Sequence, residues 1–316
     1  MNTSSAQRIV SLLPSATEII CSLGLEDGLV GVTHECDFPP GVEQKPQLTA
    51  SKIIHGSMDS REIDHAVRKS LDGHGSIYDL DEEKLRELNP DLIVTQELCD
   101  VCAVSYETVR KAARRYTADA TVVSLEPNTI GDIFENIVEV GELAGVRETA
   151  EKVVAGLRQR LDALLEKTSD IRDRPKVMML EWLDPPFAPG HWVPEQVEAA
   201  GGECVLGRAG EKSVTTTFEE VAESNAEIVV LIPCGYDTHG ILEQLERTSF
   251  PSVLKDLPAF ANGNVWALDA SAYFSRPGPR VVDGAEIIAK IFHPDVFGVP
   301  AEGEAVRLGA EKIRFE

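Results

Sequence analysis

The sequence predicts an α/β protein with two lobes of mainly parallel β-sheet joined by a long helical segment. Three observations lead to this fold class. Short apolar runs alternate with helical patterns in both halves of the chain, one long helical stretch separates them, and 316 residues suffice for two compact domains. We therefore expect a first lobe over 1–129, a linking helical spine over 130–170 and a second lobe over 171–316.

The first lobe begins with short apolar runs that we predict as strands, at 8–12, 29–33, 91–95 and 121–125. A polar excursion over 51–78 separates the second from the third, and we expect a short helix in it near 60–71. Asp81 is placed to cap the helix that follows, because its carboxylate can accept hydrogen bonds from the first turn.

The spine is the longest stretch with a helical apolar pattern, over residues 130–168. Gly145 is expected to divide it into two helices, because glycine commonly ends a helix. No further strand is predicted within it, so it is the natural connection between the two lobes.

The second lobe repeats the alternation, with predicted strands at 176–180, 228–232 and 264–268, the last of these being the final strand. Ligands of parallel sheets bind outside the carboxyl ends of the strands. The loops expected at those ends are 34–40, 96–102, 181–192 and 270–280.

These loops carry the residue types that a large conjugated ligand requires, which are flat apolar faces with a few fixed polar groups. The candidate ligand-binding residues are Asp37, Phe38, Trp182, Phe187, Tyr273, Phe274 and Arg276. The alternative is that these aromatic side chains only pack the edges of the lobes.

The formal net charge of −23 argues against two classes of partner, nucleic acid and anionic membranes, because both are themselves negatively charged. The acidic residues are spread along the chain, which is typical either of an ordinary solvated surface or of adaptation to high salt. No apolar run approaches the roughly 20 residues that span a bilayer, so no membrane insertion is expected. We expect a monomer.

The first residues contain no basic segment followed by an apolar one, so the sequence as written shows no signal peptide. The expected location is cytoplasmic, or extracytoplasmic if the chain is a trimmed mature form.

Several segments resemble, in order and spacing, the family of periplasmic proteins that bind cobalamin and iron chelates for ABC transporters. The resemblance spans about residues 8–292, and no single motif is diagnostic. It is carried by Arg8–Glu18, Gly31–Pro40, Leu88–Ile93, Asp184–Phe187, Ala200–Glu203 and Phe274–Arg280.

The resemblance implies two Rossmann-like lobes joined by a long helix, with a ligand in the cleft between them and no catalysis. The implied ligand is a corrinoid, with cobalamin as the first candidate, held for ABC-type uptake or for intracellular handling. A siderophore or haem is the alternative ligand. The resemblance also implies one docking glutamate per lobe for the membrane subunits, which we place at Glu83 and Glu219. Simple stabilisation of a helix start is the other explanation for both residues.

The thiols leave a further hypothesis open. Cys99 and Cys102 form a C-x-x-C pair after a predicted strand, and His34 and Cys36 follow another. The paired thiols could be ordinary reduced side chains in the cleft or the structure, or they could form a redox disulfide. With His34 and Cys36 they could instead form a tetrahedral metal site, or thiols could contact the cobalt of a corrinoid. A disulfide or metal site would make the protein a thiol-based metal or redox protein. Cys21, Cys204 and Cys234 are expected to be small core residues. The sequence has no nucleophile elbow, phosphate-binding glycine loop or HExxH helix.

Overall fold

The computed structural model describes residues 8–53, 58–74, 77–96, 106–116 and 120–316, and these fall into two compact units. The described parts of Met1–Gly56, His65–Pro127 and Gly131–Leu157 make the first unit. Those of Ser57–Asp64, Asn128–Ile130 and Arg158–Glu316 make the second. The segment that we expected to link the lobes is therefore shared between the two units.

The first unit contains a four-stranded parallel sheet in the order β2-β1-β5-β6. Its strands match the predicted ones at slightly shorter lengths, and β1 and β5 are buried along their whole length. They are β1 (Ile9–Ser11), β2 (Leu29–Gly31), β5 (Leu92–Thr95) and β6 (Thr121–Ser124).

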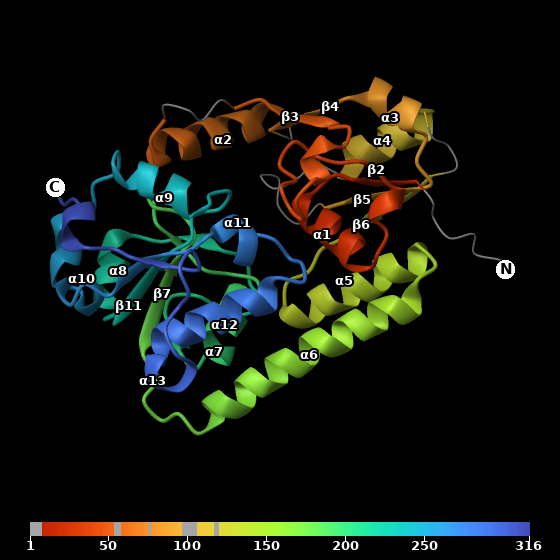
Figure 1. The fold of residues 1–316 in the computed structure, drawn as a ribbon. Helices are drawn as coiled ribbons and strands as arrows, with labels where there is room; N and C mark the ends of the chain where they lie inside the picture. The colour runs from red at the N-terminus through yellow and green to blue at the C-terminus, as the bar shows by residue number, and fades with distance from the viewer. Residues whose placement is uncertain (1–7, 54–57, 75–76, 97–105, 117–119) are drawn as a thin grey trace. The chain divides into compact units, whose positions relative to one another are not determined.

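Helices cover both faces of this sheet (Figure 1). Leu85 of α3 (Glu82–Leu88) and Val109 of α4 (Tyr106–Tyr116) pack on Val10 and Ile93 in one apolar cluster. On the other face lie α1 (Pro14–Ser22) and α5 (Ile130–Leu143) (Figure 1). The polar excursion forms α2 (Ser60–His74), which confirms the helix expected there. Two short antiparallel strands that we did not predict enclose α2 in the sequence, β3 (Thr49–Ser51) and β4 (Tyr78–Leu80).

The second unit contains a five-stranded sheet in the order β13-β12-β11-β7-β9. All neighbours are parallel except β13, which runs antiparallel to β12 at the edge. The prediction that 264–268 is the final strand is therefore wrong. Two residues near the C-terminus pair with it, too few to give a sequence pattern. The strands are β7 (Lys176–Leu180), β9 (Glu203–Cys204), β11 (Ile228–Leu231), β12 (Val265–Ala267) and β13 (Val306–Arg307).

This second sheet is also covered on both faces (Figure 1). One face packs against α8 (Phe218–Glu223), α9 (Thr238–Leu245) and α10 (Pro258–Ala261) through a cluster centred on Met178, Val229 and Val265. The other face is covered by α7 (Val193–Ala199) and α12 (Val281–Phe292), which contact each other. Short elements complete the unit: the antiparallel pair β8 (Phe187–Ala188) and β10 (Val214–Thr215), α11 (Ala270–Tyr273) and α13 (Pro294–Phe297).

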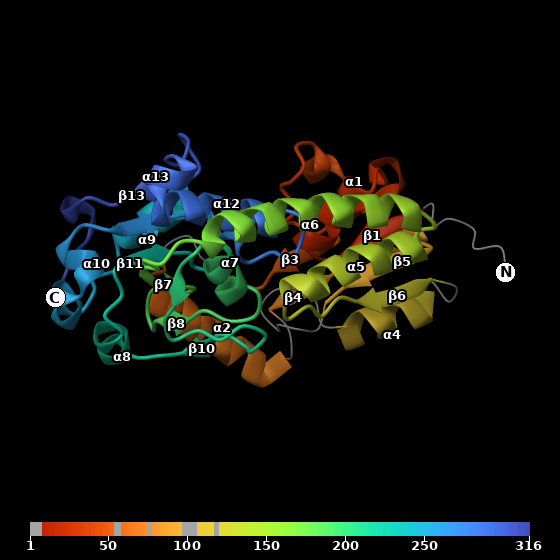
Figure 2. The same ribbon diagram turned by 90° about the horizontal axis from the view of Figure 1, so that it is seen from below.

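The spine is two helices, α5 and α6 (Arg147–Ser169), with Gly145 between them at a φ of 75°. The left-handed backbone at Gly145 is the helix end that the sequence predicts. Within the first unit α5 and the start of α6 lie side by side (Figure 2). They can approach closely because Gly141 has no side chain, and a Cβ there would overlap the Cβ of Ala150.

The two sheets share one strand order. If the parallel strands of each sheet are numbered in sequence order, their spatial order across the sheet is 2-1-3-4 in both units. The direction of the strand order reverses between β1 and β5, and again between β7 and β11. Ligands of parallel sheets bind at such reversals, beyond the carboxyl ends of the strands. The fold therefore predicts a ligand site in the loops that follow these strands.

The contact between α5 and α6 gives a stability prediction. Gly141→Ala should lower the free energy of unfolding by about 1–3 kcal/mol, because the new methyl group overpacks the contact with Ala150. Gly156→Ala in α6 is the matched control, since a Cβ there meets nothing within 4 Å. The control should raise stability by up to about 1 kcal/mol through helix propensity. Urea unfolding of both variants checks this, and equal effects would contradict the proposed packing.

Candidate functional site

The loop after β2 is anchored by a buried thiol. Cys36 is 2% exposed, and its sulfur lies 3.1 Å from the Thr17 hydroxyl oxygen. The Thr17 hydroxyl donates to Ser11 at 2.8 Å, so the anchor reaches the end of β1. The next two residues, Asp37 and Phe38, are exposed, with Phe38 at 40%. Both predicted ligand residues of the first unit therefore lie on its surface.

His34 and Glu35 in the same loop are held against the β3–β4 pair. The His34 ring nitrogen Nδ1 lies 2.7 Å from the Thr49 hydroxyl, and the Tyr78 hydroxyl donates to Glu35 at 2.7 Å. The His34 and Tyr78 rings meet edge to face, 5.5 Å apart. His34 and Cys36 therefore have different hydrogen-bonding partners.

The described residues contain no group of three or more His, Cys, Asp or Glu side chains that could hold a metal ion. Cys99 and Cys102, the other two residues of the metal hypothesis, lie outside the described residues. The remaining thiols differ from one another. Burial raises the pKa of Cys204 to about 12, whereas Cys234 is exposed, so the expectation that Cys234 is a core residue is wrong.

In the second unit, two predicted aromatics lie together at the end of β7. Trp182 and Phe187 pair across the turn that connects β7 to β8, where the Phe187 amide donates to the Trp182 carbonyl. Both side chains are half-buried. The structure therefore brings together two of the aromatic residues that the sequence singled out.

The loop after β11 adds a third aromatic ring that we did not predict. Tyr236 lies 6.0 Å from Trp182, and Gln244 donates to its hydroxyl at 3.3 Å. Burial raises the pKa of Tyr236, so this hydroxyl stays protonated. The amide of Cys234 donates to the carbonyl of Glu181, which ties the loops after β7 and β11 together at the reversal of the strand order.

The loop after β12 carries two predicted aromatic residues that differ in their exposure. Asp269 caps α11 by accepting from the Ala272 amide, and burial raises the pKa of its carboxyl group. Tyr273 is half-buried under the Arg280 guanidinium, 5.9 Å from its ring, and Arg276 is partly exposed. Phe274 is only 2% exposed, and its carbonyl accepts from the Trp192 indole at 2.8 Å. Phe274 therefore packs inside the unit, and its ring offers little exposed surface to a ligand.

His191, which lies between β8 and α7, is a conformationally unusual residue that the sequence reasoning passed over. It has a φ of 51°, which is unusual for histidine, and its ring nitrogen Nε2 is buried without a hydrogen-bond partner. Burial lowers the pKa of this imidazole. The preceding residue is fixed by Glu181, which accepts from the Gly190 amide at 3.1 Å. Backbone strain of this kind is common at functional sites.

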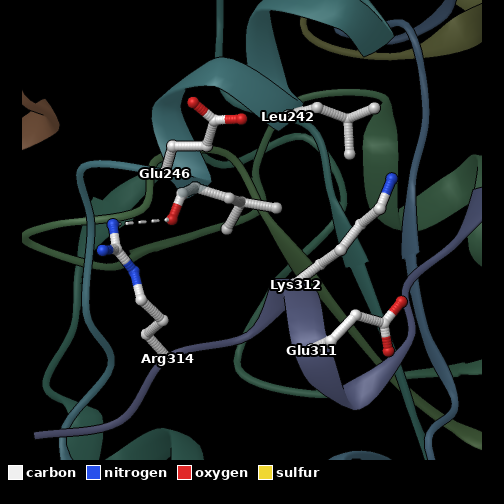
Figure 3. Close-up of a pocket in the computed structure, with 6 residues that line it drawn as sticks. Leu242, Glu246, Glu311, Lys312 and Arg314 are labelled. Carbon is white, nitrogen blue, oxygen red and sulfur yellow. Dashed lines mark hydrogen bonds between the residues drawn. The ribbon is translucent and has the colours of Figure 1, made fainter.

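A hollow of about 290 Å³ lies elsewhere in the second unit, between α9 and the C-terminal segment (Figure 3). Arg314 reaches the Leu245 carbonyl across it at 3.4 Å. None of the predicted ligand-binding residues lines it, and its volume is at the lower limit for pockets that bind drug-sized ligands. We therefore do not assign it to the main ligand. Its lining residues are Leu242, Leu245, Glu246, Glu311, Lys312 and Arg314.

The comparisons with known proteins agree with this architecture. A family model described as periplasmic binding protein matches residues 9–272. The chain belongs to the periplasmic binding protein family. This is a family of solute-binding proteins and not of enzymes.

Curated relatives and solved structures cover most of the chain. A vitamin B12-binding protein of Vibrio cholerae is 24% identical over 284 residues, which are 89% of this chain and 87% of the relative. A cobalamin-binding protein of Halobacterium salinarum is 24% identical over 300 residues, 92% of this chain and 70% of the relative. A solved periplasmic haem-binding protein from Pseudomonas aeruginosa has a TM-score of 0.69 at 19% identity, covering 96% of this chain and 100% of its own. This last likeness shows the fold alone.

In this periplasmic binding protein the two expected docking glutamates occupy equivalent positions. Glu83 and Glu219 are each the second residue of a helix, α3 and α8, and both are exposed. Asp81 and Thr217 cap these helices through side-chain hydrogen bonds to the backbone. Within the described residues, neither glutamate side chain forms an ion pair. Over that same part of the chain, no helix has the length and apolar character needed to cross a membrane.

His191 gives a pH prediction. Its folded pKa lies below the unfolded value of about 6.5, so the unfolded chain takes up the proton more readily. The stability from keeping this imidazole neutral is fully present above pH of about 6.5 and is lost as the pH falls. His191→Asn, which tolerates the left-handed backbone, should therefore lose less stability than the parent between pH 7.5 and 5.5 (assay values chosen on both sides of about 6.5).

Thermal unfolding at the two pH values measures this difference. His65→Asn on the exposed side of α2 is the control for removing a histidine as such. An equal pH dependence in His191→Asn and the parent would show that His191 does not contribute to it.

Proposed function

We propose that this solute-binding protein binds a corrinoid, with cobalamin as the first candidate, through the loops that follow β2, β7 and β12. The observation that carries the proposal is the aromatic group at the reversal of the second sheet, where Trp182, Phe187 and Tyr236 lie together. Ring faces at such a position suit a flat conjugated macrocycle. The two relatives named for vitamin B12 and cobalamin support the same ligand class.

The residues predicted from the sequence have separate roles in this proposal, and Tyr236 supports the Trp182 ring from the neighbouring loop. The rings of Trp182, Phe187 and Tyr273 cover apolar faces of the ligand, and the Arg276 guanidinium donates to carbonyl groups at its rim. In the first unit, Phe38 supplies an exposed ring and Asp37 an acceptor for amide N–H groups. Phe274 is left out of this set, since its ring is already buried in the protein.

Absorbance spectroscopy distinguishes the ligand classes. The purified protein is incubated separately with cyanocobalamin, haem and a ferric siderophore, and then freed of unbound ligand by gel filtration. We expect stoichiometric retention of cyanocobalamin. Retention of haem alone would instead favour the ligand class named for the haem-binding relative in fold, and retention of the siderophore alone would favour an iron chelate.

Trp182→Ala should weaken cyanocobalamin binding by tenfold or more, because loss of a buried aromatic contact costs on the order of 2 kcal/mol. The matched control is Trp266→Ala, which removes a tryptophan from β12 whose ring lies against Arg307 of β13. Isothermal titration of both variants gives the affinities. Parent-like affinity in Trp182→Ala would refute the placement of the ligand on this loop.

We also propose that Glu83 and Glu219 dock the protein onto the membrane subunits of an ABC importer. Their equal positions in α3 and α8 and their exposure support this role. In this proposal the ligand is met outside the cytoplasm, and an intracellular handling protein would need no such docking.

The double variant Glu83→Lys, Glu219→Lys should abolish binding to the importer in nanodiscs and leave ligand affinity unchanged. The control reverses Glu87 and Glu223, exposed residues near the other ends of the same helices, and should still bind. If both double variants bind the importer like the parent, the two glutamates only stabilise their helix starts.

A further inference from the structure

The start of α2 packs with the second unit although the chain enters and leaves it through strands of the first. Residues Met58–Asp64, which we call the strap, belong to the second unit, whereas β3 and β4 on either side belong to the first. A reciprocal capping box fixes where the helix begins. The Glu62 amide donates to Asp59 at 2.9 Å, and the Asp59 amide donates to Glu62 at 3.0 Å.

The strap is bound to the loop after β7 by a charged pair. The Arg61 Nε–H donates to one carboxylate oxygen of Asp184 at 3.0 Å, and Nη2 lies 2.8 Å from the same oxygen as an ion pair. The Asp184 side chain is 17% exposed and that of Arg61 is 72% exposed. Charge-assisted hydrogen bonds of this kind are stronger than bonds between neutral groups.

Two further hydrogen bonds reach backbone carbonyls of the strap. The Trp182 indole N–H donates to the Ser60 carbonyl at 3.0 Å, and Gln244 of α9 donates to the Met58 carbonyl at 3.2 Å. The first turn of α2 accordingly lies beside α9 (Figure 1). Ser60 and Ile63 are buried, so the contact is packed and not only electrostatic.

These contacts determine how Trp182 can meet a ligand. The single N–H of the indole is already used by the Ser60 carbonyl, and Tyr236 lies 6.0 Å from the indole ring. The ring orientation is therefore set before any ligand arrives, which lowers the entropic cost of binding. What the indole offers to a ligand is a ring face and not a hydrogen bond.

We propose that Arg61 is a positioning residue of the ligand site and that, through Asp184, it holds the strap against Trp182 in the binding orientation. This inference rests on the proposed function, since it requires that Trp182 contacts the ligand. Arg61 itself does not touch the ligand. It acts on the ring by keeping the Ser60 carbonyl opposite the indole N–H.

A charge-exchange series with cyanocobalamin tests this role in the full chain. Arg61→Glu should weaken binding about tenfold, because two carboxylates then face each other and the strap detaches. Asp184→Lys should have a similar effect. The double variant Arg61→Glu, Asp184→Lys should recover affinity to within about threefold of the parent. Lys69→Glu, an exposed charge reversal on the same helix, is the control and should bind like the parent.

Hydrogen exchange without ligand provides a second readout. In Arg61→Glu, exchange should rise in peptides covering 58–64 and 181–187, and the double variant should restore it. Faster exchange there with parent-like cyanocobalamin affinity would overturn the positioning role and leave the proposed function standing. Failure of the double variant to recover affinity would also overturn it. If the parent retains no cyanocobalamin, the proposed function fails and the positioning role fails with it.

Discussion

The parallel pairing of β7 with β11, and of β1 with β5, is the constraint on which the rest of this molecule depends. Parallel strands place all their carboxyl ends at one edge of a sheet, so the loops that follow them converge there. Because the strand order reverses at these pairs, the connections on each side run apart and leave the loop surface accessible. The aromatic group of the second unit arises in this way, from the loops after two adjacent strands.

A loop that binds a large ligand needs support, since it has no ladder hydrogen bonds of its own. In the second unit that support comes from several directions. The Cys234 amide binds the Glu181 carbonyl, the short β8–β10 pair carries Phe187, and the strap binds Trp182 and Asp184. In the proposed site, the aromatic loops are thus held in place by contacts other than those that we assign to the ligand.

The sequence predicted the elements whose stability comes from burial. The runs 177–180 and 228–232 are apolar throughout because both sheet faces are covered, and they lie in β7 and β11. Two-residue strands such as β8, β10 and β13 are too short to show an alternating apolar pattern and were missed.

The site was predicted less well, because residue type does not specify burial. Phe274 and Phe187 look alike in the sequence, but one ring is inside the protein and the other is half-exposed. The bond from Trp182 to the Ser60 carbonyl had no sequence signal, since any residue provides a carbonyl.

Hydrogen–deuterium exchange of the full chain, with and without cyanocobalamin, tests the proposed ligand site most directly. We expect slower exchange with ligand in peptides covering 33–39, 181–187 and 272–276, and no change at 242–246 and 311–314, which line the hollow near Arg314. Slowing confined to the hollow, or no slowing in any of the three loops, would contradict it.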